Sequence, residues 1–199
     1  IYMYASGSDR TYAYNLNIED NRVSSSGNGI YILSIGSSYA YVYNITMRNN
    51  EVSSAQDAIF IGAYTSASSA YAYVSNITIR NNRVISNGNG IYISSYRSLG
   101  EVRGATYAYA CNITIQDNEV TSTNNGIYIY AYVESNYRPY AVPYIYVYTS
   151  NITVQNNKVM SNKTAIHLYA HGDDYAYAYG INVHANKVTS SENGIYIYV

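Results

Sequence analysis

One stretch of 18 residues, 76–93, recurs along the whole chain. It reads Asn-Ile-Thr-Ile-Arg-Asn-Asn-Arg-Val-Ile-Ser-Asn-Gly-Asn-Gly-Ile-Tyr-Ile, and five other copies align beneath it without a gap. Every copy has an asparagine at the same turn position: Asn21, Asn50, Asn82, Asn118, Asn157 and Asn186. Only the linkers vary, so that successive turn asparagines lie 29 to 39 residues apart. A unit of fixed length between variable linkers is typical of a solenoid, because an insertion inside the unit would break its register with both neighbours.

Within each copy, apolar and polar residues alternate over three to five positions, which predicts short, half-buried β-strands. The pattern Asn-Ile-Thr-Ile-x-x-Asn-x-Val, with Gly-Ile-Tyr-Ile five residues later, resembles the right-handed parallel β-helix repeat family. That family includes pectate lyases, phage tailspikes and surface proteins of archaea and bacteria. The resemblance implies an all-β fold: a right-handed parallel β-helix of about six coils, forming one solenoid domain over residues 1–199. It is specific to the fold and leaves the function open.

The turn asparagines have a structural role in this prediction. Asparagine tolerates a left-handed backbone, and coils stacked about 4.8 Å apart let its amide bond to the amides above and below. Inward-facing Ile, Leu, Met and Val side chains would stack in the same way. We therefore expect an asparagine ladder along one corner and aliphatic ladders in the core.

The chain departs from the family pattern in its tyrosine-rich arms of variable length. The strand that ends each arm alternates Tyr with Ala or Val, as in Tyr39-Ala-Tyr-Val-Tyr43. If this strand continues unbroken, the tyrosines share a side with the core residues Ile45 and Met47, and Ala40 and Val42 face the other way. Neither face is charged, so we expect both to be covered, one of them by lateral packing of the arms against another molecule.

Five asparagines begin glycosylation sequons: Asn44, Asn76, Asn112, Asn151 and Asn162. The first four are Asn-Ile-Thr, which the strand pattern itself produces, and glycans on consecutive coils would crowd one another. Asn162 begins Asn-Lys-Thr in a different turn, where a glycan has more space. N-linked glycans are expected partners if the chain is exported.

The overall charge excludes several classes of function. With 11 Lys and Arg against 12 Asp and Glu, the net charge of −1 offers no basic face for nucleic acid. No apolar run approaches the roughly 18 residues of a membrane-spanning helix, so membrane insertion is not expected. The 29 tyrosines and 12% charged residues suggest a protein that assembles or is coated with glycans. A start at Ile1 without Met favours an exported chain at the cell surface.

Catalytic and metal-binding residues are scarce. The densest polar group, His171-Gly-Asp-Asp174, fits ordinary turn chemistry, and the three histidines lack a metal-binding spacing. Cys111 is the sole cysteine and takes a position held by Ser75 and Ser150 in other coils. We therefore expect neither an enzyme nor a cofactor.

Both ends of the repeat array are plain strand sequences without a cap. The edge residues are Ile1, Tyr2, Met3 and Tyr4 at one end and Ile195, Tyr196, Ile197, Tyr198 and Val199 at the other. Uncharged edges of this kind are templates for pairing, and contacts between opposite ends propagate as a filament. The sequence therefore predicts a structural subunit of an extracellular filament or surface layer that polymerises head to tail. The alternative is a carbohydrate-binding or adhesive module of a larger surface protein.

Overall fold

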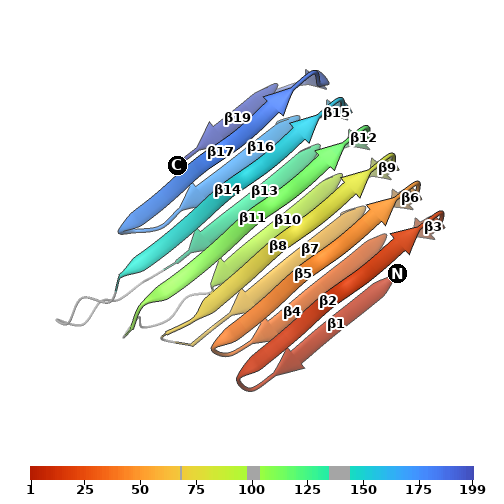
Figure 1. Cartoon of the computed structure of the whole chain (residues 1–199). Coiled ribbons are helices and arrows are strands. Elements are labelled where there is room, and N and C mark those ends of the chain that lie inside the picture. Colours follow the sequence, from red (N-terminus) through yellow and green to blue (C-terminus); the bar gives the residue numbers. More distant parts are fainter. Residues whose placement is uncertain (68, 98–103, 135–143) are drawn as a thin grey trace.

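The structure is a computed structural model that describes residues 1–67, 69–97, 104–134 and 144–199. Its strands form three parallel sheets, and the chain passes from sheet to sheet as it winds upward (Figure 1). Strands that are neighbours in a sheet are therefore one coil apart in the sequence. The predicted all-β solenoid of about six coils is confirmed.

Each sheet collects one strand from every coil. Sheet A has seven strands: β1 Tyr2–Gly7, β4 Ile30–Gly36, β7 Ile59–Thr65, β10 Ile91–Arg97, β13 Ile127–Val133, β16 Ile166–His171 and β19 Ile195–Tyr198. Sheet B has six long strands: β2 Arg10–Glu19, β5 Tyr39–Arg48, β8 Tyr71–Arg80, β11 Thr106–Gln116, β14 Ile145–Gln155 and β17 Tyr175–His184. Sheet C has six short strands: β3 Arg22–Ser25, β6 Glu51–Ser54, β9 Arg83–Ser86, β12 Glu119–Ser122, β15 Lys158–Ser161 and β18 Lys187–Ser190. Each variable arm joins a strand of sheet A to a strand of sheet B, and the described arms, such as those from β1 to β2 and from β4 to β5, turn on one side of the molecule (Figure 1).

The core consists of columns of equivalent residues from successive coils. Ile59, Ile91 and Ile127 lie one above another in sheet A and are fully buried, as are Ile77 and Ile113 in sheet B. Burying one such side chain stabilises the fold by roughly 1.5–3 kcal/mol. The expected inward aliphatic ladders are present, and each column extends through the coils without a break.

The long strands of sheet B do not continue unbroken, and the expected facing of the tyrosines is wrong. Asn44 has φ 56°, a left-handed conformation, in the middle of β5. This kink shifts the alternation by one residue, so Ala40 and Val42 are buried on the same side as Ile45. Tyr41 and its neighbours point outward instead. The same kink recurs in every strand of the sheet, at these residues: Asn15, Asn44, Asn76, Asn112, Asn151 and Gly180.

Between the arms and the kink, sheets A and B pack closely against each other through small residues. Ala72 and Ala108 of sheet B and Ala63 and Ala131 of sheet A are all fully buried. A hydrogen bond of 2.8 Å from Ser95 Oγ to the carbonyl oxygen of Ala72 crosses between the two sheets. This half of each coil is therefore a thin blade with tyrosine on its outer faces.

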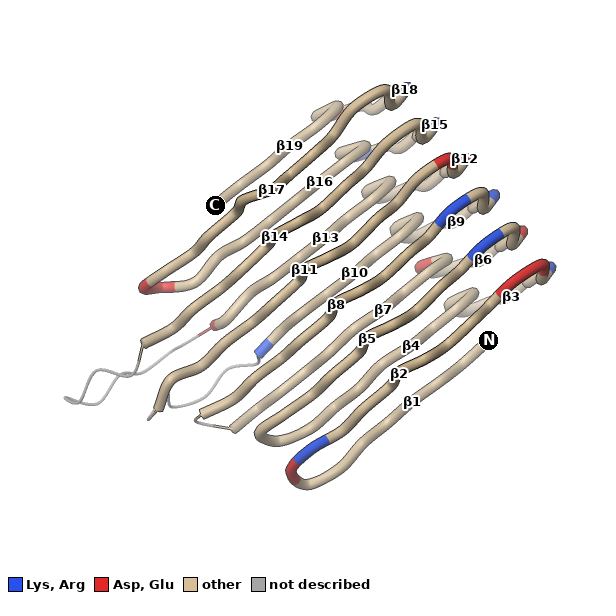
Figure 2. The backbone as a smooth tube through the Cα atoms, viewed as in Figure 1, with Lys and Arg blue, Asp and Glu red and all other residues tan. Residues whose placement is uncertain are grey.

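Charged residues gather at the corners and arm tips, and the long sheets are almost free of charge (Figure 2). In sheet C, the first residues of the strands form a column of alternating charge. Glu51 is 3.2 Å from Arg22 and 3.1 Å from Arg83, and Glu119 is 2.6 Å from Lys158. The next residue in the column, Lys187, breaks the alternation because it follows Lys158.

Candidate functional site: amide ladders, aromatic columns and open edges

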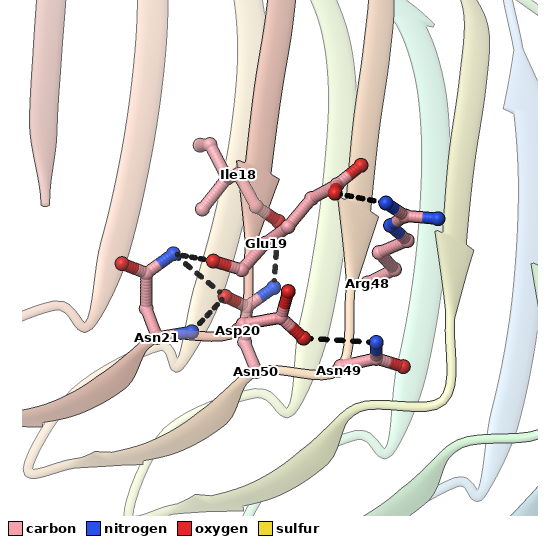
Figure 3. A network of polar contacts seen from close by, with 7 residues as sticks. All are labelled: Ile18, Glu19, Asp20, Asn21, Arg48, Asn49 and Asn50. Carbon is pink, nitrogen blue, oxygen red and sulfur yellow. Dashed lines mark hydrogen bonds and ion pairs between the residues drawn. The ribbon is translucent and has the colours of Figure 1, made fainter.

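The turn asparagines form a continuous amide ladder. The Nδ2 and backbone N–H groups of Asn21 both donate to Oδ1 of Asn50, at 3.0 and 3.1 Å (Figure 3). The Nδ2 group of Asn50 also donates to the carbonyl oxygen of Ile18, at 2.8 Å. The same pattern links all six: Asn21, Asn50, Asn82, Asn118, Asn157 and Asn186. Each amide thus satisfies buried backbone groups of its own coil and of its neighbours.

The left-handed backbone expected at the ladder asparagines lies one residue earlier. Asp20, Asn49 and Ala185 are examples, with φ between 52° and 57°. The ladder side chain must point into the corner, so the preceding residue makes the tight turn. Asn and Asp are suited to that conformation because their short polar side chains bond locally. Asn49 Nδ2 donates to Asp20 Oδ1 at 2.9 Å, and Arg48 forms an ion pair with Glu19 beside them (Figure 3).

The ladder has a donor end and an acceptor end. Within each pair of ladder asparagines the earlier residue donates and the later one accepts, so Asn21 Oδ1 accepts no hydrogen bond from the described residues. At the other end, the Asn186 side chain accepts from Asn157, whereas its own backbone N–H has no acceptor within the described part of the chain. The two ends are complementary.

Four of the sequon asparagines form a second ladder on the surface. They occupy the kink of sheet B, where Asn76 Nδ2 donates to Asn44 Oδ1 at 3.1 Å. The same bonds continue through Asn112 and Asn151. Asn162 lies elsewhere, exposed in the turn after β15. The role of the kink asparagines was missed from the sequence, although glycine at the sixth equivalent position, Gly180, signals a positive φ.

The outward tyrosines of sheet B stack in columns. In the column that we call the Tyr107 column, five rings lie nearly parallel: Tyr39, Tyr71, Tyr107, Tyr146 and Tyr175. Their centroids are 4.7–5.2 Å apart and their interplanar angles are 8–14°. The Arg10 guanidinium covers the first ring, 4.7 Å from its centroid.

Sheet A carries a similar outer column. Its members are Tyr2, Tyr31, Phe60, Tyr92, Tyr128, His167 and Tyr196, one from every strand of the sheet. Burial raises the pKa of Tyr92 and of Tyr128 to about 12. Burial also lowers the pKa of His167, whose ring stacks on Tyr128. These side chains are held in their neutral forms.

Two columns are aromatic only at their ends. One in sheet B reads Tyr14, Tyr43, Ser75, Cys111, Ser150 and Tyr179. One in sheet A reads Tyr4, Leu33, Gly62, Ser94, Tyr130, Tyr169 and Tyr198. In these two columns, the last coil and the first coil therefore resemble each other more than either resembles the middle. Reading the aligned copies column by column would have revealed this from the sequence.

A hollow of about 320 Å³ opens on the outer face of sheet A. Its walls are Tyr64, Tyr92, Ser94, Tyr96, Tyr128, Tyr130, Tyr132 and Glu134. Tyr96 donates a 2.9 Å hydrogen bond to Glu134, and burial together with this carboxylate raises the pKa of Tyr96 to about 12. Aromatic walls with a few polar groups are typical of ligand sites.

The predicted edge residues lie at opposite ends of sheet A. All nine, Ile1 to Tyr4 and Ile195 to Val199, are exposed, by 37% to 71%. The Ile1 amine donates to the carbonyl oxygen of Gly29 at 2.7 Å, which holds β1 on its neighbour β4. The core columns of sheet B end at the same two ends of the solenoid, because Ile18 and Val183 are only partly buried, whereas their equivalent Ile79 is fully buried.

Two residues considered for catalysis in the sequence make contacts within the fold. Asp174 Oδ2 accepts from the Ile145 N–H at 2.9 Å, which links the arm before β17 to the first residue of β14 in the preceding coil. Cys111 is buried with its Sγ 3.6 Å from the Tyr73 hydroxyl, and burial raises the pKa of its thiol. The described residues contain no group of three His, Cys, Asp or Glu side chains that could hold a metal ion. Nor do they include a helix long and apolar enough to cross a membrane.

Comparison with known proteins identifies the architecture and leaves the activity open. No curated protein and no solved structure matches the chain. The family model of the right-handed beta helix region matches residues 3–199, and that family contains pectate lyase-like enzymes as well as non-enzymes. Since the match covers almost the whole chain, this protein belongs to the right-handed beta-helix family.

Proposed function

We propose that this protein is a non-catalytic structural subunit of an extracellular filament or surface layer, in which copies stack end to end. The observation that carries the proposal is the match between the two end coils. Columns that are aromatic only at their ends, such as that of Tyr14 and Tyr179, become continuous when the last coil of one copy meets the first coil of the next. A second copy is therefore the partner that fits each end.

Sheet B brings the longest strands, β2 and β17, to such a joint. If β17 of one copy takes the coil-to-coil register with β2 of the next, Tyr177 stacks on Tyr12 and Tyr179 on Tyr14. Tyr175 would cover the free face of the Arg10 guanidinium. The small inward residues of both strands would continue the buried columns of the blade.

The amide ladder and the core support the same register. The backbone N–H of Asn186 would donate to Oδ1 of Asn21 in the next copy, so that donor end meets acceptor end. Ile181 and Val183, partly buried at the open end, would be covered by Leu16 and Ile18. Apolar surface buried at roughly 25 cal/mol per Å² then favours association.

Sheet A imposes one condition on this joint, because it has seven strands and sheets B and C have six. The register just described brings β19 of one copy and β1 of the next to the same rung. The two strands have equivalent sequences, Ile195-Tyr-Ile-Tyr198 and Ile1-Tyr-Met-Tyr4, so either can occupy that rung. Pairing β19 directly on β1 would instead leave a rung empty in sheets B and C. We propose the joint in which one of the two strands is displaced.

A charge pair across the joint tests the proposal. Tyr179→Lys and Tyr14→Glu should each raise the concentration needed for assembly by about two- to tenfold, because each removes an aromatic contact of about 0.5–1.5 kcal/mol. The double variant, with both substitutions in one chain, should assemble again, as measured by sedimentation velocity and negative-stain microscopy. Tyr14 and Tyr179 lie in the first and last strands of sheet B, so rescue can come only from contact between copies.

The matched control is Tyr179→Lys with Tyr4→Glu, which places the same charges in different sheets and should give no rescue. Circular dichroism establishes that every variant keeps its coils. If the unmodified chain remains monomeric at high concentration, or if Tyr14→Glu fails to rescue Tyr179→Lys, the joint is not the one proposed.

The hollow on sheet A favours a second candidate, a carbohydrate-binding module. Tyrosine faces and the Glu134 carboxylate could hold a sugar ring by stacking and hydrogen bonding. Calorimetric titration with acidic and neutral polysaccharides tests this, with Tyr132→Ala expected to abolish binding and Tyr146→Ala, outside the hollow, expected to leave it unchanged. No polysaccharide should be cleaved in either case.

A further inference from the structure

The Tyr107 column has a property that neither candidate function requires. Its five phenols lie on successive strands of sheet B, and the parallel pairing of these strands holds each tyrosine beside the next one in the column. Rings in neighbouring coils are 4.7–5.2 Å apart, closer than rings two residues apart in one strand, such as Tyr107 and Tyr109 at 5.9 Å. The fold therefore pairs phenols from distant parts of the sequence.

We propose that the Tyr107 column is a site of oxidative dityrosine crosslinking, in which a haem peroxidase and hydrogen peroxide join successive coils covalently. The column is on the outward face of sheet B, and its rings are half-buried to exposed, so the phenols are open to an oxidant. The chain has a single cysteine, so a disulfide within one chain is excluded. A carbon–carbon bond between tyrosines would supply the covalent link that cysteine cannot.

The chemistry balances with peroxide as the oxidant. Each of two phenols loses one electron and its hydroxyl proton, which gives two phenoxyl radicals with spin density on the ring carbons ortho to oxygen. A bond forms between one ortho carbon of each ring. The proton on each of these carbons then moves to the phenoxyl oxygen and restores both phenols. Hydrogen peroxide accepts the two electrons and two protons and becomes two molecules of water.

The geometry selects which pairs should join. Near-parallel rings place their ortho carbons face to face, and rotation about the side-chain torsions of the half-exposed rings brings them into contact. The expected pairs are Tyr39 with Tyr71, Tyr71 with Tyr107, Tyr107 with Tyr146, and Tyr146 with Tyr175. The adjacent column is interrupted at Tyr73, whose ring is tilted by 58° to both of its neighbours, although its Tyr109–Tyr148 pair is as close and as parallel as the pairs above.

The test is treatment of the folded chain with a haem peroxidase and hydrogen peroxide, followed by dityrosine fluorescence and mass spectrometry of tryptic peptides. Trypsin cleaves after Arg48, Arg80, Arg103 and Lys158 but not after Arg138, which precedes a proline. A second digestion with a glutamate-specific protease, which cleaves after Glu119 and Glu134, places each tyrosine of the column on a different peptide. The expected products are peptide pairs from neighbouring coils that have lost two hydrogen atoms. Their yield per chain should not depend on protein concentration.

Two comparisons make the result decisive. Tyr107→Phe keeps the stack but removes one phenol, so it should abolish both crosslinks of residue 107 and leave those at Tyr39 and Tyr175 in place. Tyr31→Phe, a control in sheet A, should change none of the four. The proposal is overturned if the urea-unfolded chain gives the same pairs in the same yields, or if crosslinks form only between chains. It does not depend on end-to-end stacking.

Discussion

Asn82 Nδ2 lies 3.0 Å from Oδ1 of Asn118, its equivalent one coil further along the solenoid. The same Asn82 amide donates to the carbonyl oxygens of Met47 and Arg80, at 3.2 and 2.9 Å. It also accepts from the backbone N–H of Asn50 at 2.9 Å. One side chain therefore satisfies buried polar groups in three successive coils.

Replacing the Asn82 side chain should lower the free energy of unfolding substantially. Asn82→Ala leaves the buried N–H of Asn50 without its acceptor, which costs about 1–3 kcal/mol, and removes one donor each from the carbonyl oxygens of Met47 and Arg80. We therefore expect a loss of roughly 2–5 kcal/mol in the free energy of unfolding. Asn186→Ala, at the open end, should cost only about 1 kcal/mol, because water can reach the groups it exposes. Chemical denaturation of both variants measures the difference. Equal losses in the free energy of unfolding would contradict the conclusion that the ladder stabilises the fold most where it is buried.

Ala185 offers a stabilising substitution. Its φ is 52°, whereas the equivalent residues in the other coils are Asn or Asp. A left-handed conformation costs an alanine roughly 1 kcal/mol, which asparagine and glycine largely avoid. Ala185→Asn should therefore raise the free energy of unfolding by about 0.5–1 kcal/mol, measured by urea denaturation. Ala178→Asn, in a strand of the same coil, is the control and should give no gain.

A substitution at Lys187 should strengthen the proposed joint between copies. In the stacked register it would face Arg22 of the next copy, a repulsive pair in a column that otherwise alternates in sign. Lys187→Glu should restore the alternation and lower the critical concentration for assembly several-fold, since exposed ion pairs contribute about 0.2–1 kcal/mol each. Lys187→Gln should give an intermediate value. If Lys187→Glu weakens assembly, sheet C does not meet in this way.

High pH should destabilise the coils over a defined window. The pKa of Tyr64, Tyr92 and Tyr128 is about 12 in the folded chain, against 10.0 for the unperturbed phenol. The folded state thus holds these protons more tightly, and the stability they contribute is complete below pH 10 and is lost as pH rises toward about 12. Thermal unfolding followed by circular dichroism should show a falling midpoint across this window. Tyr128→Phe should flatten the fall, and a midpoint independent of pH would contradict the assignment.

Much of the fold could be predicted from the sequence because every coil repeats the same short strand pattern. The period-two pattern around residues such as Ile77 and Ile91 identified strands, and the fixed length of the unit required a solenoid. The facing of the arm tyrosines could not be predicted by the same rule, because the Asn44 kink reverses the alternation within one strand. Alternation is reliable only while every residue keeps an extended backbone.

The candidate site was predictable in part. The edge strands at Ile1 and Ile195 follow directly from the repeat pattern. The seven-to-six strand count and the match of Tyr14 with Tyr179 can also be read from the aligned copies. The outward facing of these tyrosines depends on the kink in each strand of sheet B, which the structure supplies. The hollow beside Glu134 arises from rings contributed by several coils, so no single repeat contains its signal.

The thin blade formed by Ala72, Ala108 and Ala131 gives the molecule a lopsided cross-section, broad in one direction and narrow in the other. Resistance to bending grows steeply with the thickness of a body in the plane of bending. A stack of such coils would therefore flex readily across the flat faces of the blade and resist bending within its plane. In mechanical terms it would be a ribbon and not a rod, with a tyrosine coat on the two faces that strain most.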